Sequence, residues 1–367
     1  TLSLHDALPI LPILTLAFVW LSQTSAFAQI GGAITGESYE GKPMPKIATA
    51  EPVLGEINFE DDLYIEKDIM LQGALGYKRI DFTVPRHWEI LEGSRAELYL
   101  SHSPTLIPDL SAFTAILNGK VIHTMALERS NINVTTIVLK LPRDILSDYN
   151  VLELIANQHY TMECEDPFDP SLWTTVHRSS RLLINHRKIV PYIDLAFYPY
   201  PIYEKQSYDD AVIDYMLPAQ PSQTTLGAIA RFQTAFGRFI PSRSKVSYNV
   251  HIGPSGEPVN HMILIGTPQE NEAIRKFADL PTESALPLPL ITEPGFSPKF
   301  TYPNGGKIDG DQGIIIFTHH PDNAEIAVLI LSGNSAAGVD KAVTAITEIP
   351  YEKSFAGQAR SEERRVG

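Results

Sequence analysis

The sequence predicts a chain of mixed β and α/β class, with a jelly-roll β-sandwich followed by a flavodoxin-like three-layer α/β domain. In the first half, short β-type runs recur between turn signals, which is typical of an all-β sandwich. In the second half, apolar strand runs alternate with helical patterns, as in α/β domains. With 367 residues and a hydrophobic fraction of 44%, the chain has enough apolar side chains for two cores.

The first 57 residues are expected to precede the folded domains. An apolar run at 11–21, followed by Ala26-Phe27-Ala28, is typical of an export signal peptide, which with the residues before it makes up segment 1–28. A membrane anchor is the alternative, but the run is shorter than the roughly 20 residues that span a bilayer. Residues 29–57 are rich in Gly, Pro and small polar residues and are predicted to form a flexible lead-in.

The predicted sandwich covers residues 58–190. Its clearest local signal is Asn118-Gly119, because both central positions of a type I′ hairpin turn need positive φ, which these two residues tolerate. Phe113 and Leu117 alternate toward a core before the turn, and Val121 continues the apolar pattern after it. The expected strands cover residues 79–84, 96–100, 112–117, 120–127, 133–140, 151–156 and 181–186.

The predicted α/β domain covers residues 191–350. Its first segment, 195–202, contains two prolines and is interpreted as a linker or edge strand. One helix is predicted at 224–236, where Gly237 ends it, and another begins at the capping box of residues 267–270. The expected buried helix positions are Leu226, Ile229, Phe232, Phe236, Ala273, Ile274, Phe277, Val339, Ala342, Val343 and Ile346. The expected strands cover residues 211–217, 248–252, 262–265, 313–317 and 326–331, with an antiparallel pair around 319–323.

No catalytic or cofactor motif is visible in the sequence. A net charge of −14 does not supply the concentrated Lys and Arg that bind phosphate, so no nucleic-acid partner is expected. The glycine loop at 333–338 fails as a phosphate loop, because Val339-Asp340 stands where Lys and Ser or Thr are required. His319 and His320 point to opposite faces of a strand and are interpreted as structural. Paired carboxylates of a glycoside hydrolase stay open, because their pairing is spatial.

An acidic loop at 163–169 contains the single cysteine, Cys164. The carboxylates beside it disfavour the thiolate form, so a catalytic thiol is not expected. Cys164 is interpreted as a small apolar filler or as a thiol that pairs between chains. Calcium prefers several oxygen ligands, but the loop lacks the EF-hand spacing and is predicted to be solvated, so the sequence predicts no metal site.

Four aromatic side chains are candidate glycan-binding residues: Tyr77, Trp88, Tyr99 and Trp173. A jelly roll can present such rings on its loops or its concave face, where they pack against the C–H surfaces of sugars. For each ring the alternative is packing in the core or in a loop, where large aromatic side chains bury most of their surface.

A set of local phrases spreads over residues 57–349, and each phrase alone is weak. Together they resemble the BcsB family, the periplasmic B subunits of bacterial cellulose synthase, which are also called cyclic di-GMP-binding regulatory proteins. The phrases are Ser103-Pro104 with Pro108, Leu117-Asn118-Gly119, Leu172-Trp173, Met216-Leu217-Pro218, Ala235-Phe236-Gly237 and Asp322-Asn323 before an apolar strand.

The resemblance implies a non-catalytic protein that guides nascent β-1,4-glucan through the periplasm. Family members dock onto the catalytic cellulose synthase subunit and are held at the inner membrane by a C-terminal helix. They carry the jelly-roll and flavodoxin-like pair twice, so this chain is interpreted as an N-terminal fragment. Residues 1–10 and the end of the tail 351–367 read as translated sequencing adapter, in line with that interpretation.

The family name implies a link to cyclic di-GMP. The paired Arg and D-x-S-x-x-G pattern of PilZ receptors is absent from the sequence, so the nucleotide is expected to bind the catalytic partner, and no cofactor is expected here. Two other functions are kept as alternatives: a secreted carbohydrate-binding or envelope assembly protein, and an exported glycoside hydrolase.

Overall fold

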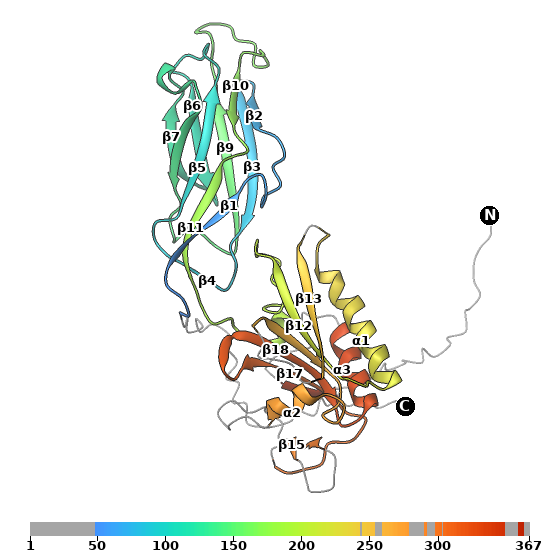
Figure 1. The fold of residues 1–367 in the computed structure, drawn as a ribbon. Helices are drawn as coiled ribbons and strands as arrows, with labels where there is room; N and C mark the ends of the chain where they lie inside the picture. The colour runs from blue at the N-terminus through green and yellow to red at the C-terminus, as the bar shows by residue number, and fades with distance from the viewer. Residues whose placement is uncertain are drawn as a thin grey trace, which may run out of the picture.

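The computed structural model describes residues 48–242, 244–253, 259–278, 290–291, 298–302, 304–348 and 359–362. Within them the chain is mostly β-sheet with three α-helices, arranged as a β-sandwich followed by an α/β unit (Figure 1). The predicted signal peptide and most of the predicted lead-in and tail lie outside the described residues. None of the described helices is long and apolar enough to cross a membrane.

Two antiparallel sheets form the first unit, as the sequence predicts for a sandwich. The seven-stranded sheet contains β1 (Val53–Asn58), β2 (Ile69–Gln72), β4 (Trp88–Ile90), β5 (Arg95–His102), β8 (Thr135–Lys140), β10 (Trp173–Val176) and β11 (Arg181–Lys188). The four-stranded sheet has the order β3-β9-β6-β7, with β3 (Leu75–Thr83), β6 (Ala112–Leu117), β7 (Lys120–Ala126) and β9 (Tyr149–Asn157).

Strand alternation builds one core between these sheets. On β5 every second residue is buried, and β6 and β9 follow the same period. The prediction of a flexible lead-in at residues 29–57 is wrong for its last residues, because strand β1 begins at Val53. It pairs with β11 along its whole length, and Ile57 is fully buried in the core.

The hairpin between β6 and β7 has the predicted turn, with φ of 49° at Asn118 and 80° at Gly119. The prediction for Val121 is wrong, because its side chain is 65% exposed. The register shifts between Ala115 and Ile116, since Ala115 pairs with His123 and Ile116 pairs with Val121. This bulge reverses the alternation of β7 and leaves Val121 facing solvent.

The second unit has a six-stranded sheet in the order β13-β12-β14-β18-β17-β19. Its strands are β12 (Ala211–Leu217), β13 (Val246–Ile252), β14 (His261–Ile265), β17 (Gly313–His320), β18 (Asn323–Gly333) and β19 (Ala359–Glu362), and β15 (Leu290–Ile291) pairs with β16 (Lys299–Phe300) apart from it. Helices α1 (Gln223–Phe236) and α3 (Ala336–Glu348) pack on one face, and α2 (Glu272–Ala278) packs on the other.

The strand order does not support the flavodoxin-like prediction. If the first five strands of this sheet are numbered along the chain, their order across the sheet is 2-1-3-5-4. A flavodoxin sheet has the order 2-1-3-4-5. The difference arises at β17 and β18, which two residues connect, too few for the crossover that parallel strands require. The two strands therefore pair antiparallel, as expected around residues 319–323.

The Pro-rich segment at 195–202 is not a linker or an edge strand. Residues Leu195–Phe197 form a 3-10 helix that Asp194 caps, and Leu195, Tyr198 and Ile202 are buried in the core beneath α1 and α3. The segment is therefore part of the α/β unit, because its apolar side chains are buried in the core of that unit.

One position of the predicted face of α1 is wrong. Leu226 is 57% exposed, whereas its neighbour Thr225 and Ala228 are buried. The predicted end of the helix is confirmed, because α1 stops at Phe236 and Gly237 is its C-cap. Gly237 has φ of −57°, so it is not left-handed, and the chain continues into a 3-10 turn. The helix positions expected in α3 are all buried.

Helix α2 begins later than the capping box predicts. The Thr267 hydroxyl accepts a hydrogen bond from the Glu270 N–H, as the motif requires, but the Glu270 carboxylate bonds to Ser222 and Thr225 of the neighbouring helix start. Asn271 caps α2 instead, since its Oδ1 accepts from the Ala273 N–H at 3.0 Å.

Candidate functional site

The four aromatic residues predicted to bind glycan do not come together. Tyr77 lies on the outer face of the four-stranded sheet, whereas Tyr99 and Trp173 lie on the outer face of the seven-stranded sheet and are partly buried. These faces are on opposite sides of the sandwich, because the core lies between the sheets. A single platform made of all four rings is therefore not present in the structure.

Trp88 packs against the sandwich core at its edge strand β4. Its ring stacks on His186 with centroids 3.4 Å apart and an interplanar angle of 9°. Gly55 makes room for this stack, since a Cβ at that position would lie 2.8 Å from the Trp88 ring and 2.7 Å from the His186 ring. Burial lowers the pKa of His186, which keeps the stacked imidazole neutral.

The outer face of the four-stranded sheet carries the most exposed aromatic side chains that point outward from a sheet. Tyr77 and Tyr149 are each 54% exposed. The Tyr77 hydroxyl donates to Glu153 at 2.7 Å, and this hydrogen bond raises the pKa of Tyr77. Arg79 bonds to Asp81 at 2.8 Å and to the Tyr149 hydroxyl at 3.3 Å. We call these five residues the outer tyrosine face.

The pairing register sets the length of the outer tyrosine face. Tyr77 is opposite Ile155 and Thr83 is opposite Tyr149, so the two tyrosines are six positions apart along the strands, or about 20 Å. Sequence reasoning missed Tyr149, although the alternation of Leu152 and Leu154 toward the core already predicts that it faces outward. The face has room for several sugar rings in a line.

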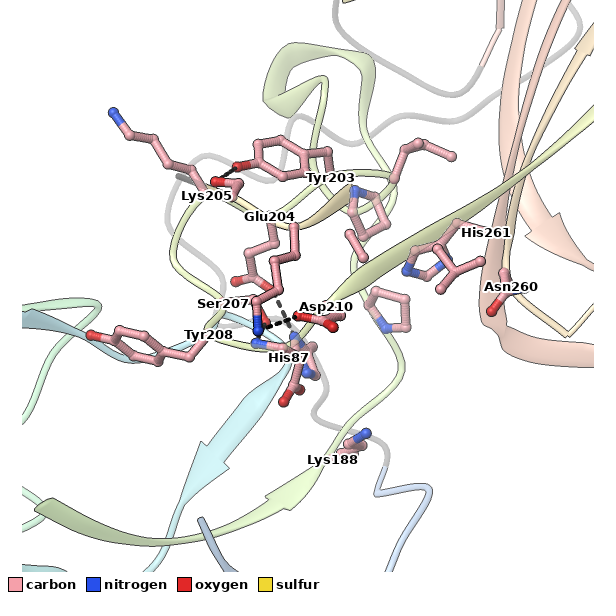
Figure 2. Close-up of a pocket in the computed structure, with 18 of the residues that line it drawn as sticks. His87, Lys188, Tyr203, Glu204, Lys205, Ser207, Tyr208, Asp210, Asn260 and His261 are labelled. Atoms are coloured by element: carbon pink, nitrogen blue, oxygen red, sulfur yellow. Dashed lines mark hydrogen bonds and ion pairs between the residues drawn. The ribbon is translucent and has the colours of Figure 1, made fainter. Parts of the chain in front are cut away.

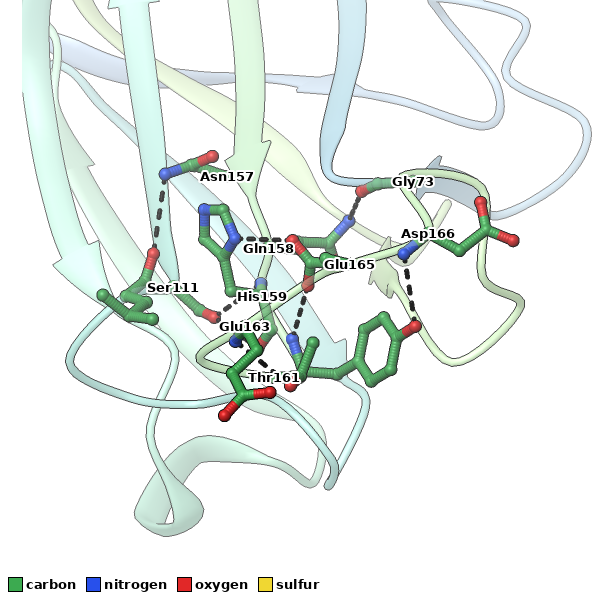
Figure 3. Close-up of polar contacts among 11 residues, drawn as sticks. Gly73, Ser111, Asn157, Gln158, His159, Thr161, Glu163, Glu165 and Asp166 are labelled. Atoms are coloured by element: carbon green, nitrogen blue, oxygen red, sulfur yellow. Dashed lines mark hydrogen bonds and ion pairs between the residues drawn. The ribbon is translucent and has the colours of Figure 1, made fainter.

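The acidic loop is held by internal contacts (Figure 3). Glu165 bonds to His159 Nδ1 at 2.7 Å and accepts from the Tyr160 N–H at 2.8 Å. Cys164 is exposed, so its interpretation as a small apolar filler is wrong, and a thiol that pairs between chains stays a prediction. Over the described residues, no group of three His, Cys, Asp or Glu side chains is placed to hold a metal ion.

The histidine pair of β17 has the arrangement predicted from strand geometry. His319 Nε2 bonds to the Pro191 carbonyl at 2.8 Å, whereas the His320 ring contacts Phe277 on the other side of the sheet. The two side chains thus stabilise different layers.

A cleft of about 580 Å³ lies between the sandwich and the α/β unit. Figure 2 shows His87, Glu204 and Asp210 close together within it, with His261 and Asn260 at one side. Glu204 joins the two units, because its carboxylate bonds to His87 Nδ1 at 2.6 Å and accepts from the Arg86 N–H.

A second interunit contact lies beside Glu204. The Tyr208 hydroxyl accepts from the Thr83 N–H at 2.9 Å, and the Thr83 hydroxyl donates to the Gln206 carbonyl at 3.0 Å. Tyr208 also packs against the sandwich core. The segment that follows the Pro-rich turn therefore ties both units together next to the cleft.

The cleft is built on the amino ends of the parallel strands. The starts of β12, β14 and β18 line it, together with the segment before β13. Ligands of open α/β sheets usually bind at the opposite, carboxyl edge, which is where the glycine loop at 333–338 lies. Sequence reasoning missed the cleft, because no motif joins residues contributed by two separate units.

His261 is a partly buried titratable group of the cleft. The Ala327 N–H donates to its Nδ1 at 3.0 Å, so the neutral ring carries its proton on Nε2. Burial, with a smaller contribution from the charge of His87, lowers the pKa of His261 to about 4. The ring is therefore a neutral hydrogen-bond donor at neutral pH, and no described residue accepts its Nε2–H.

Asp214 holds Asn260, the residue directly before β14. It is 2% exposed and accepts hydrogen bonds from Asn249 at 2.9 Å, from Asn260 at 3.3 Å and from His251 at 3.4 Å. Burial alone would raise the pKa of Asp214, but these hydrogen bonds outweigh burial and leave the pKa lowered. The buried carboxylate thereby positions Asn260 at the cleft wall.

Two family profiles match this chain, one over each unit. The profile "Cellulose synthase BcsB, first CBM domain" matches residues 56–188, and "Cellulose synthase BcsB, first FD domain" matches residues 194–358. The sandwich and the α/β unit thus correspond to two successive parts of one family. The chain belongs to the cellulose synthase BcsB family, as its local phrases indicate.

Curated relatives agree with this assignment. A cyclic di-GMP-binding protein of Xanthomonas axonopodis pv. citri (strain 306) is 29% identical over 57% of this chain and 26% of its own length. A protein of the same name from Pseudomonas fluorescens (strain SBW25) is 28% identical over 54% of this chain and 26% of its own length. Putative cellulose synthase 2 of Komagataeibacter xylinus is 25% identical over 60% of this chain and 14% of its own length. The matched regions cover about a quarter or less of these relatives.

Proposed function

We propose that this chain belongs to a non-catalytic component of the cellulose synthase complex, which guides nascent β-1,4-glucan from the membrane synthase across the periplasm. The observation that supports this proposal most directly is the match of both units to BcsB profiles. The relatives named as cellulose synthases support the link to cellulose synthesis.

In this proposal the outer tyrosine face contacts the glucan. Its two exposed rings offer apolar surfaces to sugar C–H groups, and Arg79, Asp81 and Glu153 offer hydrogen bonds to hydroxyls. Each contact is weak, which suits a polymer that must keep sliding. Tyr99 and Trp173 are partly buried on the opposite side, so the proposal depends on Tyr77 and Tyr149.

The partners in this proposal are the catalytic cellulose synthase subunit, the nascent cellulose and the inner membrane, reached through a C-terminal anchor. The sandwich, residues 58–190, is taken as a carbohydrate-binding domain, and residues 191–350 as a separate α/β domain. Cyclic di-GMP is expected to bind the catalytic partner, because a chain with a net charge of −14 repels an anionic nucleotide.

Titration with cellohexaose tests the proposal. The double variant Tyr77→Ala/Tyr149→Ala removes both rings, and we expect the affinity to fall about ten-fold, the effect of roughly 1.4 kcal/mol of lost ring contacts. Tyr99→Ala is the matched control from the other side of the sandwich. Equal weakening by Tyr99→Ala would place the glucan elsewhere, and release of reducing ends from the oligosaccharide would identify a hydrolase.

A further inference from the structure

The cleft between the two units is a second candidate binding site, separate from the outer tyrosine face. Its volume of about 580 Å³ lies within the range of small-molecule sites. Residues from both units line it, and the contacts of Glu204 and Tyr208 hold its walls together. The cavity is therefore formed in the folded chain before any ligand binds.

The charges around the cleft select against anions. Six carboxylates and three ammonium groups line it, so negative charge is in excess. The His261 ring is neutral, because burial lowers its pKa to about 4. A phosphate-bearing ligand would be repelled, whereas a neutral ligand rich in hydroxyl groups can donate to carboxylates and accept from lysines. The carboxylates are Asp61, Asp62, Glu204, Asp209, Asp210 and Glu325, and the lysines are Lys188, Lys205 and Lys245.

Two polar groups of the cleft wall have no partner among the described residues. One is the Nε2–H of His261, whose Nδ1 is already bonded to Ala327. The other is the hydroxyl oxygen of Thr49, which is buried and lacks a hydrogen bond. A buried polar group without a partner is costly, so the Thr49 hydroxyl favours a ligand that carries its own donors and acceptors. His261 is partly exposed, so its Nε2–H can donate to the same ligand.

Tyr64 adds an aromatic ring to the same cleft. Its backbone has φ of 57°, a left-handed conformation that is rare for an aromatic residue. The turn around it is fixed by hydrogen bonds from the N–H groups of Leu63 to Asn58 and of Ile65 to Phe59. The ring is 49% exposed and lines the cavity. The turn thus holds an exposed ring at the cleft in an otherwise unfavourable backbone conformation.

We propose that the cleft binds a short segment of neutral oligosaccharide, with Tyr64 as the stacking ring and His261 as a hydrogen-bond donor. If the proposed function holds, the ligand is a segment of β-1,4-glucan, and this inference rests on that function for its choice of sugar. The sandwich and the α/β unit then bind the glycan jointly, next to the contacts that join them.

The test uses cellohexaose and the Tyr77→Ala/Tyr149→Ala background, in which the outer tyrosine face is disabled. We expect this variant to retain binding at the cleft. Adding Tyr64→Gly is expected to weaken the remaining affinity five- to ten-fold, the effect of losing one stacked ring. Glycine tolerates a positive φ, so the added change should not unfold the protein, which its thermal unfolding curve checks.

Phe168→Ala in the same background is the matched control, because Phe168 is an 85% exposed aromatic of the acidic loop, outside both surfaces. Residual binding whose affinity Tyr64→Gly leaves unchanged, or that cyclic di-GMP displaces, would overturn the cleft proposal. A background variant that binds nothing, beside a wild-type protein that binds, would overturn it and leave the proposed function intact. A wild-type protein without affinity for cellohexaose would contradict both the cleft proposal and the proposed function.

Discussion

At the scale of single residues, His261 has a pKa that depends on its surroundings in the folded protein. In the unfolded chain its imidazole titrates near pH 6.5, and in the folded protein its pKa is about 4. The hydrogen bond from Ala327 to Nδ1 uses the lone pair that a proton would need. Protonation of the folded protein therefore requires both a charge in a partly buried site and the loss of this bond.

We expect the free energy of unfolding to fall as the pH is lowered from 6.5 to about 4. In this window the unfolded chain binds a proton at His261 and the folded chain does not, so acid favours the unfolded state. The contribution is about 2 kcal/mol, less than the full shift would give, because the ring is partly open to the cleft. Urea unfolding near neutral pH and at about pH 4.5 measures it.

The control for this titration is His261→Asn. Its amide oxygen can accept from the Ala327 N–H, but the side chain does not take up a proton in this range. The variant should lose distinctly less stability between the two pH values than the wild type. An equal loss in both proteins would assign the pH dependence to other groups.

At the scale of one element, the β6–β7 hairpin depends on its first turn residue. The Asn118 side chain donates to the Ile145 carbonyl at 2.8 Å and to Asn150 at 2.9 Å, and it accepts from the Val151 N–H at 2.8 Å. It therefore ties the turn to the start of β9 in addition to adopting positive φ. The turn motif read from the sequence predicts only the second role.

We expect Asn118→Ala to destabilise the protein by about 2–3 kcal/mol, because it removes three hydrogen bonds and leaves alanine with positive φ. Asn118→Gly keeps the backbone conformation and loses only the bonds, so it should be about 1 kcal/mol less harmful. Urea unfolding of both variants separates the cost of the lost hydrogen bonds from the cost of positive φ at alanine. Equal stabilities would show that the left-handed backbone costs nothing at this position.

Helix α2 shows how neighbouring elements change a local motif. Thr267 and Glu270 have the spacing of a capping box, and the Thr267 half of the motif forms. The Glu270 half does not form, since the start of α1 lies close enough for Glu270 to bond to the Ser222 N–H and the Thr225 hydroxyl. The residue thus supports the capped end of another helix.

At the scale of the whole molecule, the two units are joined by a small number of polar contacts, most of them partly buried. The Glu204 side chain is 6% exposed and accepts from His87 and Arg86 of the sandwich. The Arg86 guanidinium in turn lies over the rings of Phe197 and Tyr200, which belong to the Pro-rich segment of the α/β unit. Removing one acceptor here leaves donors of the other unit unpaired.

We expect Glu204→Ala to loosen the interface and to leave both units folded. The lost acceptor costs about 1 kcal/mol, because two hydrogen bonds across the interface are lost and water can replace them only in part at the half-buried His87. Limited proteolysis should cut faster within residues 190–210, and the scattering-derived radius of gyration should rise. Glu92→Ala, at an exposed acid of the sandwich, is the control. Unchanged cleavage in Glu204→Ala would show that other contacts hold the units together.

Local patterns in the sequence determined much of the fold. Short β-type runs between turn signals predict seven of the sandwich strands, and Asn118-Gly119 predicts the hairpin between two of them, because residue type and backbone φ are local properties. Phrases spread along the chain also identified the family that the profiles assign. Strands β1, β2, β4 and β10 were not predicted from the sequence; each is held in place by pairing with a strand that is distant in the chain.

Only the tertiary structure decided which side chains share a surface. It separates Tyr77 from Tyr99 and Trp173, because the sandwich core lies between their faces, and it places Trp88 against His186. It also creates the cleft, whose walls come from two units and from the starts of strands far apart in the chain. Such sites depend on distances between residues that no local period encodes, so the candidate sites became visible only when the chain was folded.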